Sequence, residues 1–452
     1  MSHSVTQNSA FPLLRLPNEI VVEITLAARP PERELPSPTP ELPVEWSLSH
    51  VCRQLRQAVT SAATAWTWVE MDLSRRGSIQ RAELYFQRSG SCKPRVTLRS
   101  PVEADALDAF SPHLQRVSHL IVVYGMTRAF AEIMESIEGV ALPNLVHLQI
   151  DNRTGEFSSL DLSTIHAPNL VFLRMIGCTQ DLPASPLHWA RSLTHFELRR
   201  YTKDNYDKDK NLALFLGEAK HLHSVTHLYI EWDPDELLDP DGEVIDTDTY
   251  KHLRLEYDGT SHDTAVDILI RFCLRNLETL VFHGSHGPQI STLFAWVDPM
   301  DWCGPAEEKL DPRLYYPSLT SLVFHNSTAL ECTDGQGGGY EHIRAPPIAR
   351  FPSLTSLALV NQCCTAPILL DILGPGSQPW PLLDTVFVWP PDVDTEVVYT
   401  ALQDIVDWKR SNQQTVPTFR LPAELYDRPY WTANNVQVEL VSRPSDAYSA
   451  NW

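Results

Sequence analysis

The sequence contains no long hydrophobic run. No stretch approaches the roughly 18 consecutive apolar residues that a membrane-spanning helix requires, so we expect no membrane span. The opening residues, MSHSVTQNSAFPLL, lack the basic and apolar regions of a secretory signal. Cysteine is scarce, with 8 in 452 residues and no Cys-x-x-Cys pair, which is typical of reduced thiols. We therefore expect a cytoplasmic or nuclear protein.

Positive charge is also in short supply. The chain has 36 Lys and Arg against 57 Asp and Glu, a formal charge of −21. Because phosphate binding needs a net basic face, this balance argues against a nucleic-acid partner. The run from Glu231 to Asp248 alone holds nine carboxylates and no Lys or Arg. Two interpretations stay open for it: a solvated loop between strands, or a surface that steers a basic target peptide through Asp235, Asp239 and Asp241.

Motifs that would indicate catalysis are absent as well. The glycine run Gly335–Gly339 lacks the Gly-Lys-Ser/Thr ending of a phosphate-binding loop, and there is neither Gly-x-Ser-x-Gly nor His-Glu-x-x-His. His221 and His223 lack a third metal ligand, and residues 239–242 lack the order of a calcium loop. We expect no catalytic residue, no cofactor and no metal, and predict that the chain is not an enzyme.

What the sequence does contain is a repeat. A short unit, apolar-x-x-apolar-x-apolar, recurs ten times at steps of 23 to 42 residues. The units begin at Val117, Leu145, Leu170, Leu193, Val225, Tyr250, Leu277, Leu319, Leu354 and Leu383. The last four positions alternate as a half-buried strand requires, and the residue three before them is also expected to point inward. One strand and one return per unit predict stacked parallel strands with a continuous core.

These units resemble irregular leucine-rich repeats over residues 113–392. The family pattern ending in Asn or Cys is complete only in the third unit, at Cys178, so the buried asparagine ladder is expected to be mostly missing. The alternative is an ordinary α/β domain with parallel strands. After residue 392, Thr395–Trp408 predicts a helix with Val398, Leu402, Ile405 and Val406 inward, and we expect residues 393–452 to form a C-terminal cap and tail.

Two long steps between units predict inserted loops, at residues 284–317 and 327–352. Insertions in a solenoid commonly line its binding face. Large aromatic side chains dominate affinity at such surfaces. Trp296 and Trp302 in the first insertion, and Trp232 after the fifth unit, are therefore candidate target-binding residues.

The first 75 residues predict a small helical module. Leu16-Pro17-Asn18-Glu19-Ile20 opens a helix on which Leu16, Ile20, Ile24 and Ala28 share one face, with Val21 beside it. A proline-rich insertion follows at residues 29–44. A second helix is expected from Ser47 or Ser49, with Val51 and Leu55 inward, and a third segment would cover 58–73. We expect residues 1–12 to be a disordered tail, 13–75 the module, and 76–112 a helical linker or first cap.

This module resembles the F-box. The family begins with Leu-Pro-x-Glu-(Leu/Ile)-x-x-x-Ile, and its second half carries Val-Cys-Arg and a Trp about ten residues on. The insertion, and Leu55 where Trp is frequent, depart from the pattern and could weaken adaptor affinity. The matching residues, with neighbours on the same helices, are the adaptor-binding residues that the resemblance implies: Leu16, Pro17, Glu19, Ile20, Ile24, Val51, Cys52, Leu55 and Trp66.

An F-box before leucine-rich repeats is similar to the expanded F-box families of mushroom-forming fungi. The resemblance implies an α/β fold with a small three-helix N-terminal module followed by a solenoid. It also implies the substrate-recognition subunit of an SCF-type cullin–RING ubiquitin ligase, which binds the Skp adaptor and a target protein and is monomeric outside the complex. The alternative is a non-ligase interaction scaffold whose N-terminal helices only cap the solenoid.

Overall fold

The computed structural model describes the chain in segments that form two compact units, Met1–Gln180 and Asp181–Trp452. The described residues are 16–28, 44–72, 77–99, 110–124, 139–152, 158–160, 165–180, 191–199, 224–232, 245–246, 249–257, 272–283, 316–326, 351–362, 364–375, 380–391 and 395–443.

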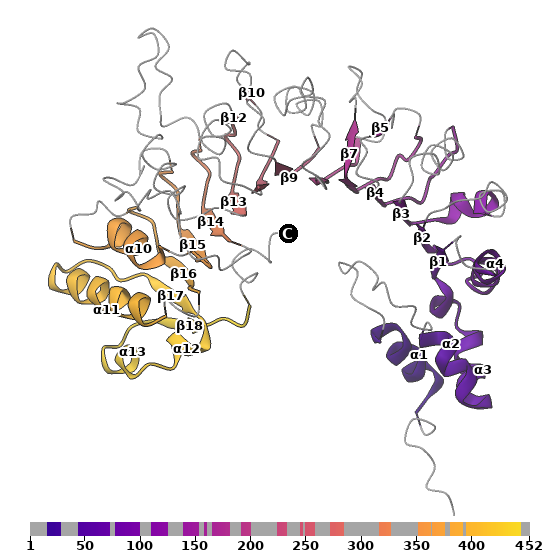
Figure 1. Ribbon diagram of the computed structural model, residues 1–452, viewed down its shortest axis with the longest axis horizontal. Helices are drawn as coiled ribbons and strands as arrows, with labels where there is room; N and C mark the ends of the chain where they lie inside the picture. The colour runs from indigo at the N-terminus through magenta and orange to yellow at the C-terminus, as the bar shows by residue number, and fades with distance from the viewer. Residues whose placement is uncertain are drawn as a thin grey trace, which may run out of the picture. The chain divides into compact units, whose positions relative to one another are not determined.

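Three short helices open the first unit (Figure 1): α1 (Asn18–Ala27), α2 (Val44–Val51) and α3 (Arg53–Ser61), followed by a 3₁₀ turn at Ala63–Trp66. Helices α1 and α2 both pack against α3. Cys52 separates α2 from α3 because it takes an extended conformation (φ −156°, ψ 170°), and its Sγ accepts a 3.5 Å hydrogen bond from the Leu55 amide as an N-cap. The second helix thus begins at Val44, earlier than Ser47 or Ser49.

The same unit contains a ladder of parallel strands in chain order. These are β1 (Trp68–Asp72), β2 (Arg95–Arg99), β3 (His119–Tyr124), β4 (His147–Asn152) and β6 (Phe172–Ile176). Helix α4 (Ser78–Arg88) and a 3₁₀ helix at Ser111–Arg116 connect the first three, and a side pair joins β5 (Ser158–Leu160) to β7 (Cys178–Gln180). The repeat pattern predicted the first strand in the repeat that begins at Val117, whereas β1 and β2 precede that repeat.

The second unit continues the same architecture. Its parallel strands are β8 (His195–Arg199), β9 (His227–Trp232), β11 (His252–Tyr257), β13 (Thr279–His283), β14 (Ser321–His325), β15 (Ser356–Val360), β16 (Thr385–Trp389), β17 (Thr418–Leu421) and β18 (Val438–Leu440). A side pair joins β10 (Ile245–Asp246) to β12 (Phe272–Cys273). Each of the ten predicted units holds one of these strands, so the predicted α/β leucine-rich-repeat architecture is confirmed.

Apolar rows between strands and returns form the core. In the second unit one row holds a fully buried residue from each of eight strands: Phe196, Leu228, Leu253, Leu280, Leu322, Leu357, Val386 and Phe419. The residue three positions earlier is buried too, at Leu193, Val225, Tyr250, Leu277, Leu319 and Leu354. The prediction that this position points inward is therefore confirmed. Because side chains alternate along a strand, the residues between these rows face the opposite, open side of the sheet.

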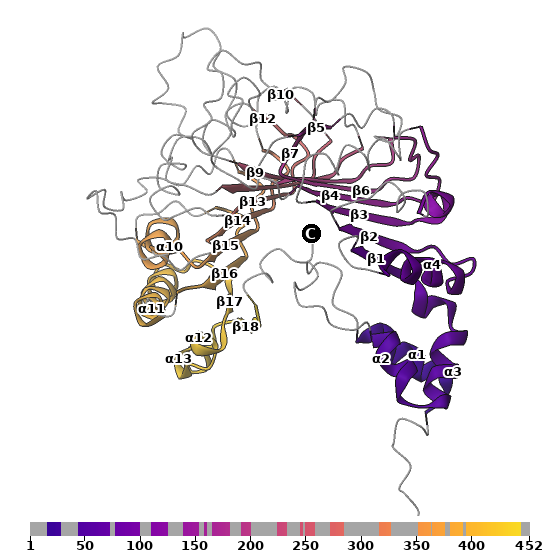
Figure 2. The ribbon, with the colours of Figure 1, turned by 45° about the vertical axis from the view of Figure 1, so that its right-hand side comes forward.

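In the described part of the second unit, helices lie on one side of the strands. They are α10 (Thr365–Leu373), α11 (Thr395–Ser411), α12 (Ala423–Tyr426) and α13 (Pro429–Ala433). Figure 2 shows α10 and α11 beside β15 to β17. Helix α11 buries Val398, Leu402, Ile405 and Val406, as its spacing predicted.

Asparagines bridge neighbouring turns one residue earlier than the repeat pattern predicted. Asn152 Nδ2 donates a 2.7 Å hydrogen bond to the Gly177 carbonyl, and Asn361 Nδ2 donates a 3.1 Å bond to the Asn326 carbonyl. The expected position held Arg153 and Gln362 instead. The asparagine ladder, which was expected to be mostly missing, is therefore partly present, one residue earlier than the repeat pattern predicts.

Candidate functional site: an exposed helical module and the open face of the strands

The helical module exposes apolar side chains on two of its helices. Ile20 and Ile24 of α1 are 45% and 38% exposed, and Val51 of α2 is 63% exposed. The sequence placed Val51 inward, which is wrong. Ile20 and Ile24, which the sequence placed on one face of the helix, lie on its exposed side. Val21 and Thr25 form the buried side of α1 instead, and the Thr25 hydroxyl is satisfied by a 2.7 Å bond to the Val21 carbonyl. A helix with apolar residues on both sides thus buries one side and leaves the other open.

The remaining predicted adaptor-binding residues divide by burial. Pro17 and Glu19 are exposed, and Leu16 and Cys52 are partly buried. Leu55 and Trp66 are almost fully buried, so they support the surface from within and do not form it. The Trp66 indole donates a 2.8 Å hydrogen bond to the Val59 carbonyl, which fixes the end of α3.

The module is joined to the first strands by a buried polar contact. The Tyr85 hydroxyl of α4 donates a 2.7 Å hydrogen bond to the Glu45 carboxylate of α2. The Tyr85 ring meets the edge of Trp66 at 5.0 Å between ring centroids, and the Arg88 guanidinium lies 4.2 Å from the Trp66 ring. This cluster ties α2, the 3₁₀ turn and α4 together inside the first unit.

Stacked rings line the open face in the first unit. Arg95 lies 4.8 Å over the Trp68 ring, while the His147 ring stacks between His119 at 5.3 Å and Phe172 at 4.3 Å. Burial chiefly, and then the positive charges nearby, lowers the pKa of His147 to about 3. The His147 imidazole is therefore neutral at pH 7, and it is part of a flat row of stacked rings.

A second histidine row lies on the open face of the second unit. His195, His227 and His252 occupy the same register position, with ring centroids 4.0 and 4.3 Å apart. The preceding hydroxyls of Thr194 and Thr226 share hydrogen bonds of 2.8 and 2.9 Å with the ring nitrogens of His195 and His227. Burial lowers the pKa of His252. Stacking and these local hydrogen bonds keep the rings nearly parallel.

A charged network lies beside this row. The Tyr229 ring is sandwiched between the guanidinium groups of Arg199 at 4.5 Å and Arg254 at 4.8 Å, and its hydroxyl bonds to Glu256. Glu256 also lies 3.2 Å from Arg254 and 3.1 Å from the His283 ring. Burial would raise the pKa of Glu256, but the bond and charge of His283, the Tyr229 hydroxyl and Arg254 lower it to about 2. The arginine, glutamate and tyrosine side chains of this network can form ion pairs and hydrogen bonds with a partner.

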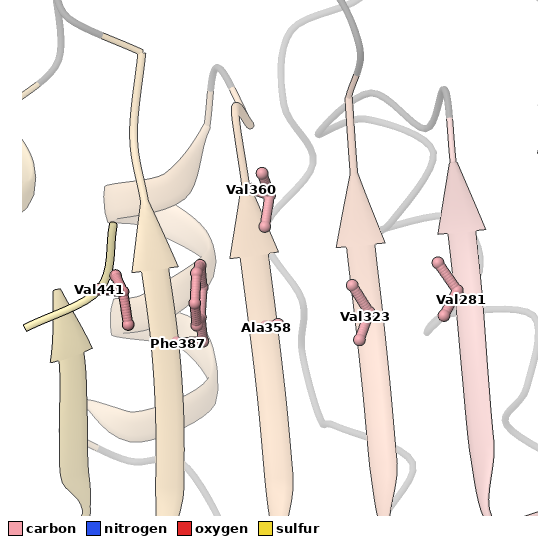
Figure 3. Close-up of a cluster of buried hydrophobic side chains, with 6 residues drawn as sticks. All are labelled: Val281, Val323, Ala358, Val360, Phe387 and Val441. Atoms are coloured by element: carbon pink, nitrogen blue, oxygen red, sulfur yellow. The ribbon is translucent and has the colours of Figure 1, made fainter. Parts of the chain in front are cut away.

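Further along the face, the side chains become apolar. Val281, Val323, Ala358 and Phe387 follow one another at the same register position on β13 to β16, with Val360 beside them (Figure 3). The open face of the second unit therefore has a polar, histidine-rich part on β8 to β11 and an apolar row on β13 to β16. His283 and His325 lie beside that row, with ring centroids 4.3 Å apart.

None of the predicted target-binding residues can be placed on this face. Trp232 is the last residue of β9, but its side chain lies outside the described residues. Asp235, Asp239, Asp241, Trp296 and Trp302 lie outside them as well. The histidine rows were not predicted, although the sequence contains a signal for them. Five of the ten repeat units carry histidine at the third position, which is the first outward site of the strand.

Metal and membrane features were sought over the same residues. Within the described ranges, no group of three or more His, Cys, Asp or Glu is placed to hold a metal ion. In that part of the chain, no helix has the length and hydropathy to cross a bilayer.

Comparison with known proteins finds a similar solved structure and no matching family. No family model matches the sequence, and no curated protein matches it. Among solved structures, the chain is similar to the leucine-rich repeat-containing protein LegL7 from Legionella pneumophila. The two are 13% identical, the match covers 75% of this chain and 86% of LegL7, and the TM-score is 0.32. The assignment of the fold therefore depends on the strand ladders described above.

Proposed function

We propose that this chain is the substrate-recognition subunit of an SCF-type cullin–RING ubiquitin ligase. Helices α1 to α3 act as the F-box that docks on the Skp adaptor, and the open face of the strands holds a target protein. The sequence features behind this proposal are the Leu16-Pro17-x-Glu19-Ile20 start and the Val51-Cys52-Arg53 segment. The chain would then belong with the expanded F-box families of mushroom-forming fungi.

The observation that carries the proposal is the exposure of Ile20, Ile24 and Val51. Leaving such side chains in water forgoes about 1.5–3 kcal/mol each relative to burial. Single exposed apolar residues are ordinary. Here, however, the three residues lie on two short helices, of 10 and 8 residues, that both pack on α3. A partner with an apolar groove would recover that free energy. The same three residues are among those that the F-box resemblance implies.

The Glu45–Tyr85–Trp66 cluster supports the same function. A receptor accelerates transfer by holding its target near the ubiquitin-charged enzyme, so a fixed link between the docking helices and the strands raises the effective concentration. The chain itself supplies no catalytic group in this proposal. It is cytoplasmic or nuclear, monomeric outside the complex, and binds neither nucleic acid nor membrane.

Adaptor capture tests the proposal. The full chain is co-expressed with a Skp adaptor and purified through a tag on the adaptor. We expect stable co-purification, and a loss of at least tenfold when Ile20→Asp and Ile24→Asp are combined. Val397→Asp is the matched control, because Val397 is equally apolar and 60% exposed on α11, far along the chain. Retention by the double variant, or failure of the native chain to bind any Skp adaptor, contradicts the proposal.

The second candidate is an interaction scaffold without a ligase. The buried Glu45–Tyr85 contact fits this function equally well, because a helical cap also needs a firm attachment to the first strands. A scaffold would bind its target without co-purifying with the adaptor, and the Ile20 and Ile24 variants would leave target binding unchanged.

A further inference from the structure

The strand ladder of the second unit ends at an exposed edge. Strand β18 pairs with β17 on one side, and in the described part of the chain no strand pairs with its other side. Figure 1 shows β18 next to β17 at the C-terminal end of the ladder. Leu440 of β18 is 55% exposed, although Leu421, its partner on β17, is fully buried. A further strand can therefore be added at this edge.

The backbone of β18 offers hydrogen-bonding groups to such a strand. Its bonds to β17 use the Gln437 carbonyl, which accepts from the Phe419 amide at 3.1 Å, and the Val441 amide, which donates to the last carbonyl of β17 at 3.0 Å. Backbone groups of successive residues point to opposite sides of a strand within a ladder, so those of Val438 and Leu440 point outward. Edges of this kind bind extended segments through main-chain hydrogen bonds.

The inward side chains of β18 select apolar residues in the added strand. Val438 and Leu440 continue the two core rows that contain Phe419 and Leu421, both of which are fully buried. Val438 is only partly buried and Leu440 is exposed, because the rows stop at this strand. Residues placed directly opposite these two would extend the core rows by one strand, and apolar side chains there would be removed from water.

Glu439 sets the charge of the position between them. Its side chain is 54% exposed, and its Oε2 lies 3.4 Å from Arg420 Nε on β17. A carboxylate can accept from more than one donor, so a lysine or arginine on the far side would continue the alternation of charge across the ladder. The wider field favours the same sign, because residues 181–452 hold 39 Asp and Glu against 20 Lys and Arg.

A second copy of the chain fits this edge less well. In an antiparallel pair of two β18 strands, the outward backbone groups would place Val438 opposite Leu440 and the two Glu439 carboxylates opposite each other. Like charges directly opposite are unfavourable in a sheet. The edge therefore favours a partner of a different sequence.

We propose that β18 binds an extended segment of a partner protein by strand addition, with apolar, basic and apolar side chains opposite Val438, Glu439 and Leu440. Main-chain hydrogen bonds hold the segment, and the three side chains select it. This interaction goes beyond the proposed function, because it uses none of the adaptor-binding residues. Adaptor capture and strand addition can therefore fail independently of each other.

Peptide binding tests the proposal. The probe is a fluorescently labelled peptide, Thr-Val-Lys-Val-Lys-Val-Thr, whose anisotropy is measured against the full chain. We expect saturable binding that weakens at least tenfold when glutamate replaces both lysines of the peptide. Methylating the backbone nitrogens of the valines, or those of the lysines, blocks one edge of the extended peptide at a time. Binding should survive only one of these two modifications, because only one edge of the peptide pairs with β18.

Variants of the chain locate the binding edge. Glu439→Lys should reverse the preference, so that the glutamate peptide binds more tightly than the lysine peptide. Leu440→Pro removes an outward N–H and no bond to β17, so it should weaken binding at least tenfold while circular dichroism shows a folded chain. Asp404→Lys is the matched control, because it makes the same change of charge at an exposed position of α11 and should leave binding unchanged.

The outcomes separate strand addition from other modes of binding. No binding of the lysine peptide, survival of both methylated peptides, or an unchanged preference in Glu439→Lys overturns the proposal. The Glu439→Lys result stands even where Leu440→Pro fails to fold, because it changes an exposed side chain. A native dimer in sedimentation that Leu440→Pro converts to a monomer also overturns the proposal, because a second copy would then occupy the edge.

Discussion

The Tyr85 hydroxyl and the Glu45 carboxylate form a 2.7 Å hydrogen bond between α4 and α2, and both residues are 3% exposed. Burial, and then the negative charge of Glu45, raises the pKa of Tyr85 far above its ordinary value. The tyrosine therefore stays a donor throughout the accessible pH range. This bond links the helical module to α4, which packs against β1.

Replacing Tyr85→Phe should lower the free energy of unfolding by about 1–3 kcal/mol, because it leaves a buried carboxylate with one donor fewer. Urea denaturation measures the change. Tyr426→Phe is the control, since the Tyr426 hydroxyl makes no hydrogen bond to the described residues and its loss should cost much less. Equal effects of the two substitutions would show that the Glu45 contact contributes nothing.

Gly177 offers a test of the turn that follows β6. Its φ of +65° disfavours L side chains, and an added Cβ would lie 2.5 Å from the Asn152 carbonyl oxygen. Gly139 has nearly the same φ, +68°, with nothing within 4 Å of the added atom. Gly139→Ala should therefore cost about 1–2 kcal/mol of stability through the backbone alone.

Gly177→Ala should cost a further 1–3 kcal/mol or so, because the turn that carries the Asn152–Gly177 bond must shift. Thermal unfolding of the two variants under identical conditions gives the difference. If their midpoints coincide, the close approach of Gly177 to Asn152 has no energetic consequence.

Strand positions were predictable because leucine spacing dominates this sequence, but two kinds of feature were not. Of the two strands that precede the ten units, β1 was missed although Trp66 stands at the apolar position three residues before Val69. Strand β2 reads Arg-Val-Thr-Leu-Arg, which alternates but has Lys93 at that position. Such a short alternating run also occurs in loops, so a pattern based on the whole repeat unit passes over β2.

The buried side of α1 could not be predicted for a different reason. Its sequence, NEIVVEITLA, places apolar residues around most of the helix, so spacing alone does not decide between Ile20 with Ile24 and Val21 with Thr25. Packing on α3 decides, and it selects the smaller pair. The exposure of Ile20 and Ile24 is the outcome most relevant to function. The histidine rows were not predicted because the repeat pattern is defined by its inward apolar positions and says nothing of the outward ones.

Lys409 is a buried cation on α11 with few compensating contacts. Its side chain is 3% exposed, its Nζ lies 3.5 Å from Gln414 Oε1, and burial lowers its pKa. Lys409→Met keeps the length of the side chain and removes the charge, so it should raise the free energy of unfolding by roughly 1 kcal/mol at pH 7. Because the lysine pKa is lowered on folding, the native chain should gain stability as pH rises toward about 10.5, and the variant should lose that gain.

Guanidinium denaturation at pH 7 and 9.5 measures both effects. Arg410→Met, one residue along the helix, is the control, because exposed Arg410 donates to the Asn434 carbonyl and its loss should reduce stability. A destabilised Lys409→Met variant would mean that the ammonium group is fully compensated where it lies.

Buried histidines should make the fold sensitive to mild acid. Burial chiefly lowers the pKa of both His147 and His325 to about 3, and it also lowers that of His252. In the unfolded chain these rings take up protons below pH 6.5, which the folded chain resists, so stability is complete above pH 6.5 and falls as pH drops toward 3. Each fully shifted ring should cost about 2 kcal/mol at pH 5. Glu256, with its pKa lowered to about 2, loses its contribution only below pH 4.5, so the range from pH 6.5 to 4.5 reports on the histidines.

His147→Phe isolates one of these rings, because phenylalanine keeps the flat stack on Phe172 and cannot be protonated. The slope of unfolding free energy against pH, measured between pH 6.5 and 5, should fall by up to one proton. Phe172→Leu is the control: it weakens the same stack at every pH and should lower the whole curve without changing its slope. An unchanged slope in His147→Phe would show that His147 takes up its proton equally in the folded and unfolded chains, and the buried, neutral state of this ring would then be ruled out.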